Sequence, residues 1–336
     1  MLVMSSDLTT KDTQHIEWNT TVGSLKFKNV FYNGNGSLVF FAQNLISHEY
    51  VFYHRTTKGT ALKRTIVSAK GSSISAVEAY WNKDKITCHG LYRKTMDGAV
   101  SGVFSVDFKE SEFINYKEDQ LFTENKTSFS PGNNQEVWKN LLLKKCVNRG
   151  KGLVILICEQ SKDYTVSYQT YNHSNYGGGY YGGYSGGYYG RYGSGQYNTE
   201  TINYESFNNI VLIALQDGKE VWRKFIPKKQ VVETSVRYWG SIAINSNAKG
   251  LFLYFNTSTN SGENSDGLAE FSGGKNYALT EIYVNNTGTI KRVEVYKGGS
   301  STREIPVISS FYFSKHNMIF LGRKGTSTKF YRLKTN

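Results

Sequence analysis

The stretch GLVILICEQ, residues 152–160, decides the fold class of this chain. Its apolar run, residues 153–158, lies between a glycine and a glutamate. A run of this length suits a strand that is buried on both faces, and it is too short for a typical buried helix. Three other stretches share the pattern of an apolar run that begins at a turn and ends in polar residues: GSLVFFAQ (36–43), KGLFLYFN (249–256) and HNMIFLGR (316–323). This recurrence indicates a repeated β unit.

The rest of the chain also favours strands. Runs of β type bounded by Gly, Asn, Asp or Ser recur throughout, among them residues 24–32, 85–92, 210–215 and 279–284. The 336 residues include thirty-three glycines and twenty-five tyrosines but three prolines, which is typical of strands and tight turns. A weak helical period is confined to residues 135–143. We therefore predict an all-β protein.

The repeated units favour a β-propeller over the other all-β architectures. A blade takes roughly 45 to 55 residues, so the chain has room for about six blades or fewer. Because the spacing of the units is uneven, a β-sandwich or a β-barrel stays open as the alternative. We predict one propeller-like domain over residues 1–336.

One segment differs in composition from everything around it. Residues 175–197 read NYGGGYYGGYSGGYYGRYGSGQY, which is almost only Gly, Tyr and Ser. Because this composition lacks the branched side chains of a packed core, we place the segment as a long insertion loop. Such a loop is either a solvated surface segment or an adaptable binding surface, since tyrosine offers a large amphipathic contact area. The predicted partner-binding residues are Tyr176, Tyr180, Tyr181, Tyr184, Tyr188, Tyr189, Arg191, Tyr192 and Tyr197.

The chain is strongly basic, with a net charge of +13 and an isoelectric point near 9.4. This charge suits an anionic neighbour such as nucleic acid, an acidic lipid surface or an acidic protein, but scattered lysines also serve only to solvate a surface. Two basic clusters stand out: Lys144, Lys145, Arg149 and Lys151, and Arg223, Lys224, Lys228 and Lys229. No nucleic-acid-binding signature accompanies them, so nucleic acid is the weakest of these partners.

The stretch DGKEVWRKFIPKKQ, residues 217–230, carries a resemblance to known proteins. Gly218 and Trp222 resemble the turn-plus-tryptophan punctuation of quinoprotein-like propeller blades, in which the tryptophan packs between blades. Together with CHGLYRKTMDGAVSGVFSVDF (88–108), LLLKKCVNRGKGLVILICEQ (141–160) and GLFLYFNTSTN (250–260), it makes the chain resemble exported Bacteroidota propeller proteins of poorly defined function.

The resemblance implies a propeller and a periplasmic or cell-envelope location. The opening residues, MLVMSSDLTTKD, lack the basic and apolar regions of a secretory signal. This departure from the family pattern leaves two alternatives open: a cytoplasmic protein, or a numbering that begins inside a longer precursor.

No catalytic constellation is recognisable in the sequence. A glycosidase needs two carboxylates roughly 5 to 10 Å apart across a cleft. Nothing in the sequence pairs any two of the candidate acids, which are Asp107, Glu110, Glu159, Glu233 and Glu281. Glu159 follows the long apolar run, so we expect it to be a hydrogen-bonded structural acid. The literal GxSxG at Gly183, Ser185 and Gly187 lies inside the Gly/Tyr segment, where a nucleophile elbow has no strand or helix to support it.

Metal and cofactor motifs are missing as well. His48, Glu49, His54 and His89 do not have metal-ligand spacing. Cys88, Cys146 and Cys158 form no CxxC, so we expect buried free thiols. The oxygen-rich loop around Asn260, Glu263, Asn264 and Asp266 lacks the order of an EF-hand, and we expect a solvated loop there. We predict neither a cofactor nor a metal.

These observations lead to a binding function as the main hypothesis. We predict a non-enzymatic, protein-binding propeller that presents residues 175–197 to a partner, in the specific form of an accessory or plug subunit of an outer-membrane type nine secretion assembly. That form rests on the family resemblance. The first alternative is a carbohydrate-binding or glycan-active propeller that uses tyrosine and tryptophan faces as sugar platforms. The second alternative is nucleic-acid binding through the basic and aromatic surface.

Overall fold

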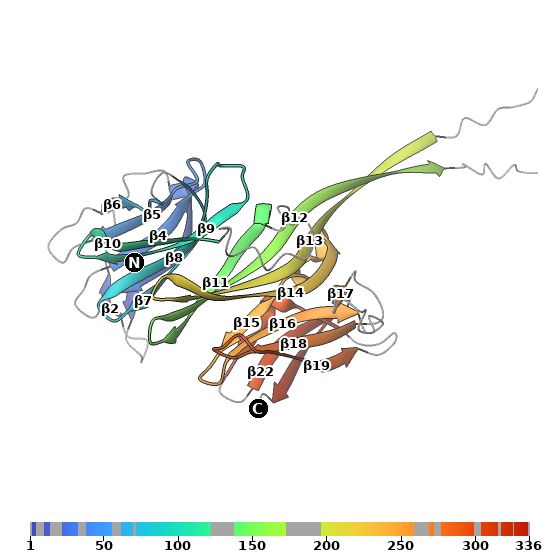
Figure 1. The fold of residues 1–336 in the computed structure, drawn as a ribbon. Helices are drawn as coiled ribbons and strands as arrows, with labels where there is room; N and C mark the ends of the chain where they lie inside the picture. The colour runs from blue at the N-terminus through green and yellow to red at the C-terminus, as the bar shows by residue number, and fades with distance from the viewer. Residues whose placement is uncertain are drawn as a thin grey trace, which may run out of the picture.

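The computed structural model describes residues 2–4, 10–13, 22–32, 38–55, 62–69, 72–121, 138–172, 196–258, 269–271, 277–298, 304–314, 317–324 and 326–334. These residues form five successive antiparallel sheets, each built on strands that follow one another in the chain, which we number I to V (Figure 1). The prediction of an all-β, propeller-like fold with six or fewer blades is confirmed.

Sheets I to III follow the order of the chain. Sheet I contains β3 (Leu25–Tyr32), β4 (Leu38–Asn44), β5 (Tyr50–Arg55) and β6 (Lys63–Ile66). Sheet II contains β7 (Ser73–Asn82), β8 (Lys85–Arg93), β9 (Val100–Lys109) and β10 (Glu112–Gln120). Sheet III contains β11 (Leu141–Gly150), β12 (Leu153–Asn172), β13 (Gln196–Gln216) and β14 (Lys219–Glu233). The short β17 (Ala269–Phe271) joins sheet III as a parallel strand beside β14.

The C-terminal part of the chain forms sheets IV and V. Sheet IV contains β15 (Ala243–Ser246), β16 (Leu251–Ser258), β18 (Tyr277–Val284) and β19 (Ile290–Gly298). Sheet V contains β20 (Ile305–Pro306), β21 (Tyr312–Phe313), β22 (Asn317–Lys324) and β23 (Ser327–Lys334), with β20 and β21 both paired to β22. Short 3-10 turns, η3 (Thr234–Trp239) and η4 (Ile308–Ser310), lead into sheet IV and interrupt sheet V. A separate two-stranded pair consists of β1 (Leu2–Met4) and β2 (Thr10–Thr13).

Each sheet shares a hydrophobic core with the next one along the chain. Phe52 of sheet I stacks on Phe108 of sheet II with ring centroids 4.8 Å apart. The buried strands β12 and β13 face both neighbours, because alternate residues point to opposite sides of a sheet. Leu156 packs toward sheet II, and Ile155 packs toward sheet IV. A further core joins sheet IV to sheet V. Within the described part of the chain, no common core joins sheet V back to sheet I.

The turn-plus-tryptophan unit of the sequence lies between two sheets. Asp217 and Gly218 both have positive φ, 51° and 85°, and they form the tight turn that asparagine, aspartate and glycine favour in hairpins. Trp222, four residues later, is half-buried in the core between sheets III and IV. Its indole nitrogen donates a hydrogen bond of 3.0 Å to the carbonyl of Asn286 in sheet IV. The packing role that the resemblance implies for this tryptophan is confirmed.

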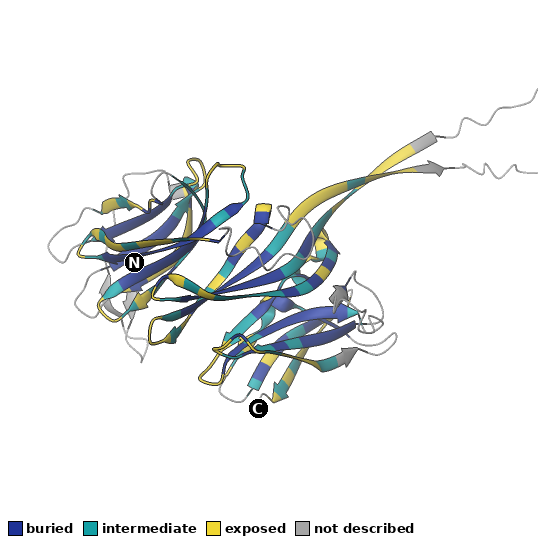
Figure 2. Ribbon diagram, in the orientation of Figure 1, coloured by how far each residue is buried: buried dark blue, intermediate teal, exposed yellow. Residues whose placement is uncertain are grey.

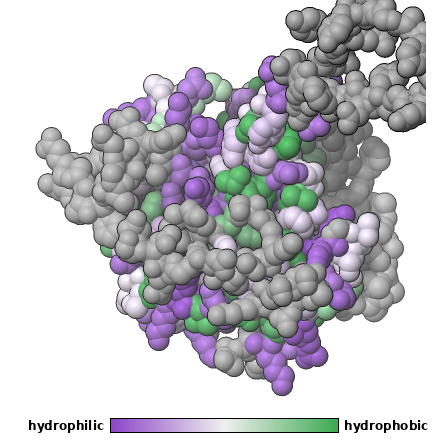
Figure 3. All heavy atoms as spheres, turned by 90° about the vertical axis from the view of Figure 1, so that its right-hand side faces the viewer, coloured by the Kyte–Doolittle hydropathy of each residue, from purple (hydrophilic) through white to green (hydrophobic). Residues whose placement is uncertain are grey.

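Strands β12 and β13 continue beyond their sheet as a two-stranded ribbon. Their antiparallel pairing extends from Leu153–Gln216 to Asn172–Gln196, with one register shift between Glu159 and Gln160, whereas the pairing of β14 ends opposite Tyr204. The outer half of this hairpin therefore projects from the body of the protein (Figure 1), and most of its described side chains are exposed (Figure 2). The face of the molecule from which the ribbon projects carries a central group of apolar side chains among hydrophilic ones (Figure 3).

The strand expected from Leu141 is confirmed as β11, whose Leu141 and Leu143 are buried in the core between sheets II and III, so the weak helical period does not extend into residues 141–143. The insertion is also shorter than its composition predicts, because Gln196 and Tyr197 already belong to β13. None of the described residues forms a helix with the length and apolar character needed to span a membrane.

Candidate functional site

Most of the predicted partner-binding residues lie outside the described residues. These are Tyr176, Tyr180, Tyr181, Tyr184, Tyr188, Tyr189, Arg191 and Tyr192. Tyr197 is the exception, since its backbone pairs with that of Tyr171 in the ribbon, where the sequence analysis expects a loop. The acids of the oxygen-rich loop, Glu263 and Asp266, and the GxSxG serine, Ser185, also lie outside the described ranges.

The ribbon that leads to the Gly/Tyr segment has two different faces. Tyr164 and Tyr204 are cross-strand partners, and their rings stack with centroids 5.5 Å apart. Tyr168 lies farther out on the same face and is 44% exposed. The opposite face is polar, with the Thr165 hydroxyl donating a 2.8 Å hydrogen bond to the Asn203 side chain. The ribbon is therefore aromatic on one side and hydrophilic on the other.

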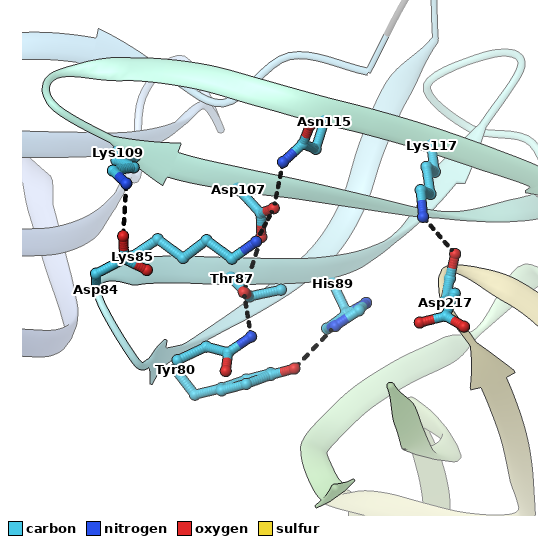
Figure 4. A network of polar contacts seen from close by, with 11 residues as sticks. Tyr80, Asp84, Lys85, Thr87, His89, Asp107, Lys109, Asn115, Lys117 and Asp217 are labelled. Carbon is cyan, nitrogen blue, oxygen red and sulfur yellow. Dashed lines mark hydrogen bonds and ion pairs between the residues drawn. The ribbon is translucent and has the colours of Figure 1, made fainter. Parts of the chain in front are cut away.

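Asp107, the first of the candidate acids, is fully engaged within sheet II (Figure 4). Its carboxylate accepts hydrogen bonds from Lys85 at 2.5 Å, Thr87 at 2.8 Å and Asn115 at 3.0 Å. Burial opposes ionisation, but these three donors hold the pKa of Asp107 below its usual range. The nearby His89 lies 3.2 Å from the Tyr80 hydroxyl. This network stabilises the sheet, and it occupies the Asp107 carboxylate fully, so that Asp107 is not available as a catalytic acid.

Glu159 is a structural acid, as predicted, and forms the centre of a buried ionic network. Lys228, which is also fully buried, donates a short hydrogen bond to it, and Lys144 lies 3.0 Å from its other oxygen. Ser241 donates a further bond of 2.5 Å from the start of sheet IV. Burial opposes ionisation of Glu159, but the two lysines hold its pKa below the usual range. Burial also lowers the pKa of Lys228 to about 8, against the opposing effect of Glu159.

The other predicted groups do not converge on a catalytic centre. Glu110 and Glu233 are exposed, the first in the β9–β10 turn and the second at the end of β14. All three cysteines are free; Cys88 and Cys158 are buried and Cys146 is partly so, in line with the prediction. Among the described side chains, no three His, Cys, Asp or Glu residues gather closely enough to hold a metal ion.

The two basic clusters of the sequence are dispersed by the fold. Lys144 and Lys228 both contact Glu159. Arg223 forms a bidentate ion pair with Glu220, with Nη2–Oε2 and Nε–Oε1 distances of 2.8 and 3.0 Å. Arg149 donates to the carbonyls of Asn247 and Gly250, and so joins sheet III to sheet IV. Four of the eight cations are thus engaged in contacts within the protein, whereas Lys145, Lys151 and Lys229 are exposed.

One half-buried carboxylate of sheet II is influenced by lysines of sheets I and III. Glu78 on β7 interacts with Lys28 on β3 and Lys145 on β11. Burial raises the pKa of Glu78, and the two lysines oppose this shift. A single carboxylate between two ammonium groups differs from the pair of carboxylates that glycoside hydrolysis uses.

A groove of about 350 Å³ between sheets IV and V combines aromatic and hydrogen-bonding side chains. Tyr254 on β16 lies directly opposite Glu281 on β18, so both project from the same face of sheet IV. Burial raises the pKa of Tyr254, and its hydrogen bond to Glu281 raises it further. Sheet V closes the groove with Met318 and Leu333. The aromatic and polar lining residues are Phe252, Tyr254, Asn245, Asn247, Glu281 and Lys334.

Comparison with known families and curated proteins finds no match. Among solved structures, a puromycin-hydrolysing peptidase of Mycobacterium tuberculosis matches with a TM-score of 0.42 and 8% identity over 93% of this chain. An exo-β-1,3-galactanase of Phanerochaete chrysosporium matches with a TM-score of 0.29 and 8% identity over 100% of the chain, and a GH43 β-1,3-galactosidase with 0.28 and 11% over 99%. The chain spans 38%, 63% and 93% of these three structures.

The prediction that the protein is not an enzyme is wrong. That prediction rests on the lack of a recognisable catalytic motif. The matching solved structures named above are all enzymes. Their low identity limits the likeness to the fold. A missing motif is therefore no argument against catalysis in this chain.

Proposed function

We propose that this protein is carbohydrate-active and holds a sugar in the groove between sheets IV and V. The observation that carries this proposal is the placement of Phe252 and Tyr254 beside Glu281 and two asparagines in one hollow. Small-molecule sites are mostly apolar hollows of about 300 to 1,000 Å³ with a few convergent polar groups. The volume of about 350 Å³ suits one or two sugar rings.

The chemistry of the groove matches both surfaces of a sugar. The half-buried ring of Phe252 offers a flat apolar face for the C–H surface of a pyranose, whereas Tyr254 is buried in the core between sheets IV and V. The Glu281 carboxylate and the side-chain amides of Asn245 and Asn247 can bond the hydroxyl groups, and a carboxylate is also the group that glycosidases use for proton transfer. Glu281 is one of the acids that the sequence analysis singles out, but Phe252 and Asn245 are not distinguished by any motif.

We expect Glu281→Gln and Phe252→Ala each to weaken sugar binding by at least about tenfold, because each removes one of the two kinds of contact. Isothermal titration calorimetry with neutral oligosaccharides of galactose, glucose, mannose and xylose measures the effect. Glu233→Gln is the matched control, since this exposed carboxylate lies on sheet III. Equal affinity for all three variants and the wild type would contradict the proposal.

The same panel tests for catalysis. Sugar release by the wild type that Glu281→Gln abolishes would assign Glu281 a role in bond cleavage. Binding without release would restrict the groove to recognition. Release that is unchanged in Glu281→Gln would place the catalytic centre elsewhere in the protein.

A second candidate function is protein binding by the ribbon, which we propose because the outer half of β12 and β13 projects from the body of the protein (Figure 1). Its aromatic face, with Tyr164 and Tyr168, resembles the tyrosine-rich contact surfaces of adaptable binders. The sequence resemblance suggests a cell-envelope partner in a secretion assembly.

We expect Tyr164→Ser with Tyr168→Ser to abolish cross-links between the ribbon and its partner in native cells, because the double change removes the aromatic face. Cross-linking mass spectrometry of the tagged protein measures this loss. Thr165→Ser on the opposite face is the control and should retain the cross-links. Cross-links that survive the tyrosine changes would argue against the aromatic face.

A further inference from the structure

A second groove lies between sheets I and II, away from the proposed sugar site. Its volume is about 430 Å³. One wall is the turn between β4 and β5, with His48 and Glu49, and the other is the start of β7, with Ser73 and Ser75. Arg93, the last residue of β8, contributes to the lining. The groove is thus rich in hydroxyl and cationic donors.

Arg93 is the cation of this groove. Its Nη1 donates to the carbonyl of Met96 at 3.4 Å, and its Nη2 donates to that of Lys139 at 3.1 Å. Its Nε is buried and has no hydrogen-bond partner among the described residues. No described carboxylate lies within ion-pair distance of the guanidinium, because Glu49, the acid in the same groove, pairs with Arg64 at 2.8 Å.

A half-buried guanidinium without a carboxylate is an incomplete ion pair. Removing such a charge from water is unfavourable unless an anion compensates it. The planar donors of arginine match the oxygens of a carboxylate, sulfate or phosphate group. Ser73 is the direct cross-strand partner of Arg93, so its hydroxyl lies on the same face of sheet II.

We propose that this groove binds a small ligand through a single oxyanion group held by Arg93 and the serine hydroxyls of β7. The net charge of +13 draws anions toward the protein from a distance, and the groove provides a defined position for one of them. Glu49, the acid in the same groove, is already paired with Arg64.

The probes are inorganic sulfate, inorganic phosphate and galacturonate, with neutral galactose as the match for galacturonate. Calorimetry at constant ionic strength is expected to give one site per chain for at least one anion. Sulfate or phosphate binding would indicate a sulfated or phosphorylated ligand, and selective galacturonate binding would indicate an acidic sugar. Absence of binding by all three anions at millimolar concentration would overturn the proposal.

We expect Arg93→Gln to weaken anion binding by at least about tenfold. Arg332→Gln, which removes the same charge from an exposed arginine of sheet V, should leave binding unchanged. Because Arg93 also bonds two carbonyls, Ser73→Asp is a second test: it places a carboxylate opposite Arg93, and it should abolish anion binding while raising the unfolding temperature.

Equal weakening by Arg93→Gln and Arg332→Gln, or unchanged binding in Ser73→Asp, would show that the anion binds only through the overall charge and would overturn the proposal. Glu281→Gln lies in the other groove and should not affect anion binding. The proposals for the two grooves can therefore be confirmed or overturned independently.

Discussion

Replacing Lys228 by methionine is expected to lower the free energy of unfolding by about 3 to 5 kcal/mol, the cost of leaving one member of a buried ion pair alone. Lys228 and Glu159 are both fully buried, so no water replaces the lost ammonium group. Lys144 and Ser241 remain beside the carboxylate, but they do not fill the space of the removed charge. Urea denaturation, with the slope of the transition compared between variants, measures the loss.

The double variant Lys228→Met with Glu159→Gln distinguishes charge from packing. We expect its loss to be smaller than the sum of the two single losses by about 1 to 3 kcal/mol, because the carboxylate that loses its buried partner Lys228 is no longer charged. Lys249→Met, a change of the same kind at an exposed lysine, is the control. A loss below about 1 kcal/mol for Lys228→Met would mean that the pair contributes no more than a surface ion pair.

His89 is expected to make the protein less stable as the pH falls from 6.5 toward 4. Burial lowers the pKa of His89 to about 4 from its usual 6.5, against the opposing effect of Asp107. In this window the unfolded chain binds a proton that the folded chain refuses, so the stability present above pH 6.5 is lost progressively. A pKa difference of this size between the folded and unfolded protein corresponds to about 3 kcal/mol of unfolding free energy.

Comparison with His89→Gln isolates this effect. Glutamine does not titrate, and its amide can still bond the Tyr80 hydroxyl. His54, whose pKa is also lowered by burial and by Lys63, contributes in the same direction and stays in both proteins. Chemical denaturation between pH 7 and pH 4.5 should therefore show a steeper decline for the wild type than for the variant. Parallel curves would show that the pKa of His89 is the same in the folded and the unfolded protein.

The sequence predicts the interior of the sheets better than their edges. Residues 153–159 are read correctly as a buried strand because the apolar run is continuous. Strand β10 (Glu112–Gln120) is missed, because its exposed charged residues give no apolar alternation. The outer half of the ribbon is missed for a related reason: Thr, Ser and Tyr alternate there without a core to select one face.

The candidate sites depend on contacts that sequence patterns do not record. Glu281 is identified as an acid, but its partner Tyr254 and the closing side chain Leu333 come from distant parts of the chain. Arg93 has no motif at all. Its importance follows from the lack of a carboxylate beside it among the described residues, which becomes evident only when the neighbouring strands are in place.

The continuity of β12 and β13 also gives the ribbon a mechanical property. A force that pulls on its outer end acts along the strands, and both strands continue into the buried centre of sheet III. To slide out, they would have to break the ladders to β11 and β14 together, under shear, instead of opening one bond after another. The ribbon is therefore firmly anchored at its base. Its outer end, which has no neighbouring strands, is expected to bend more easily.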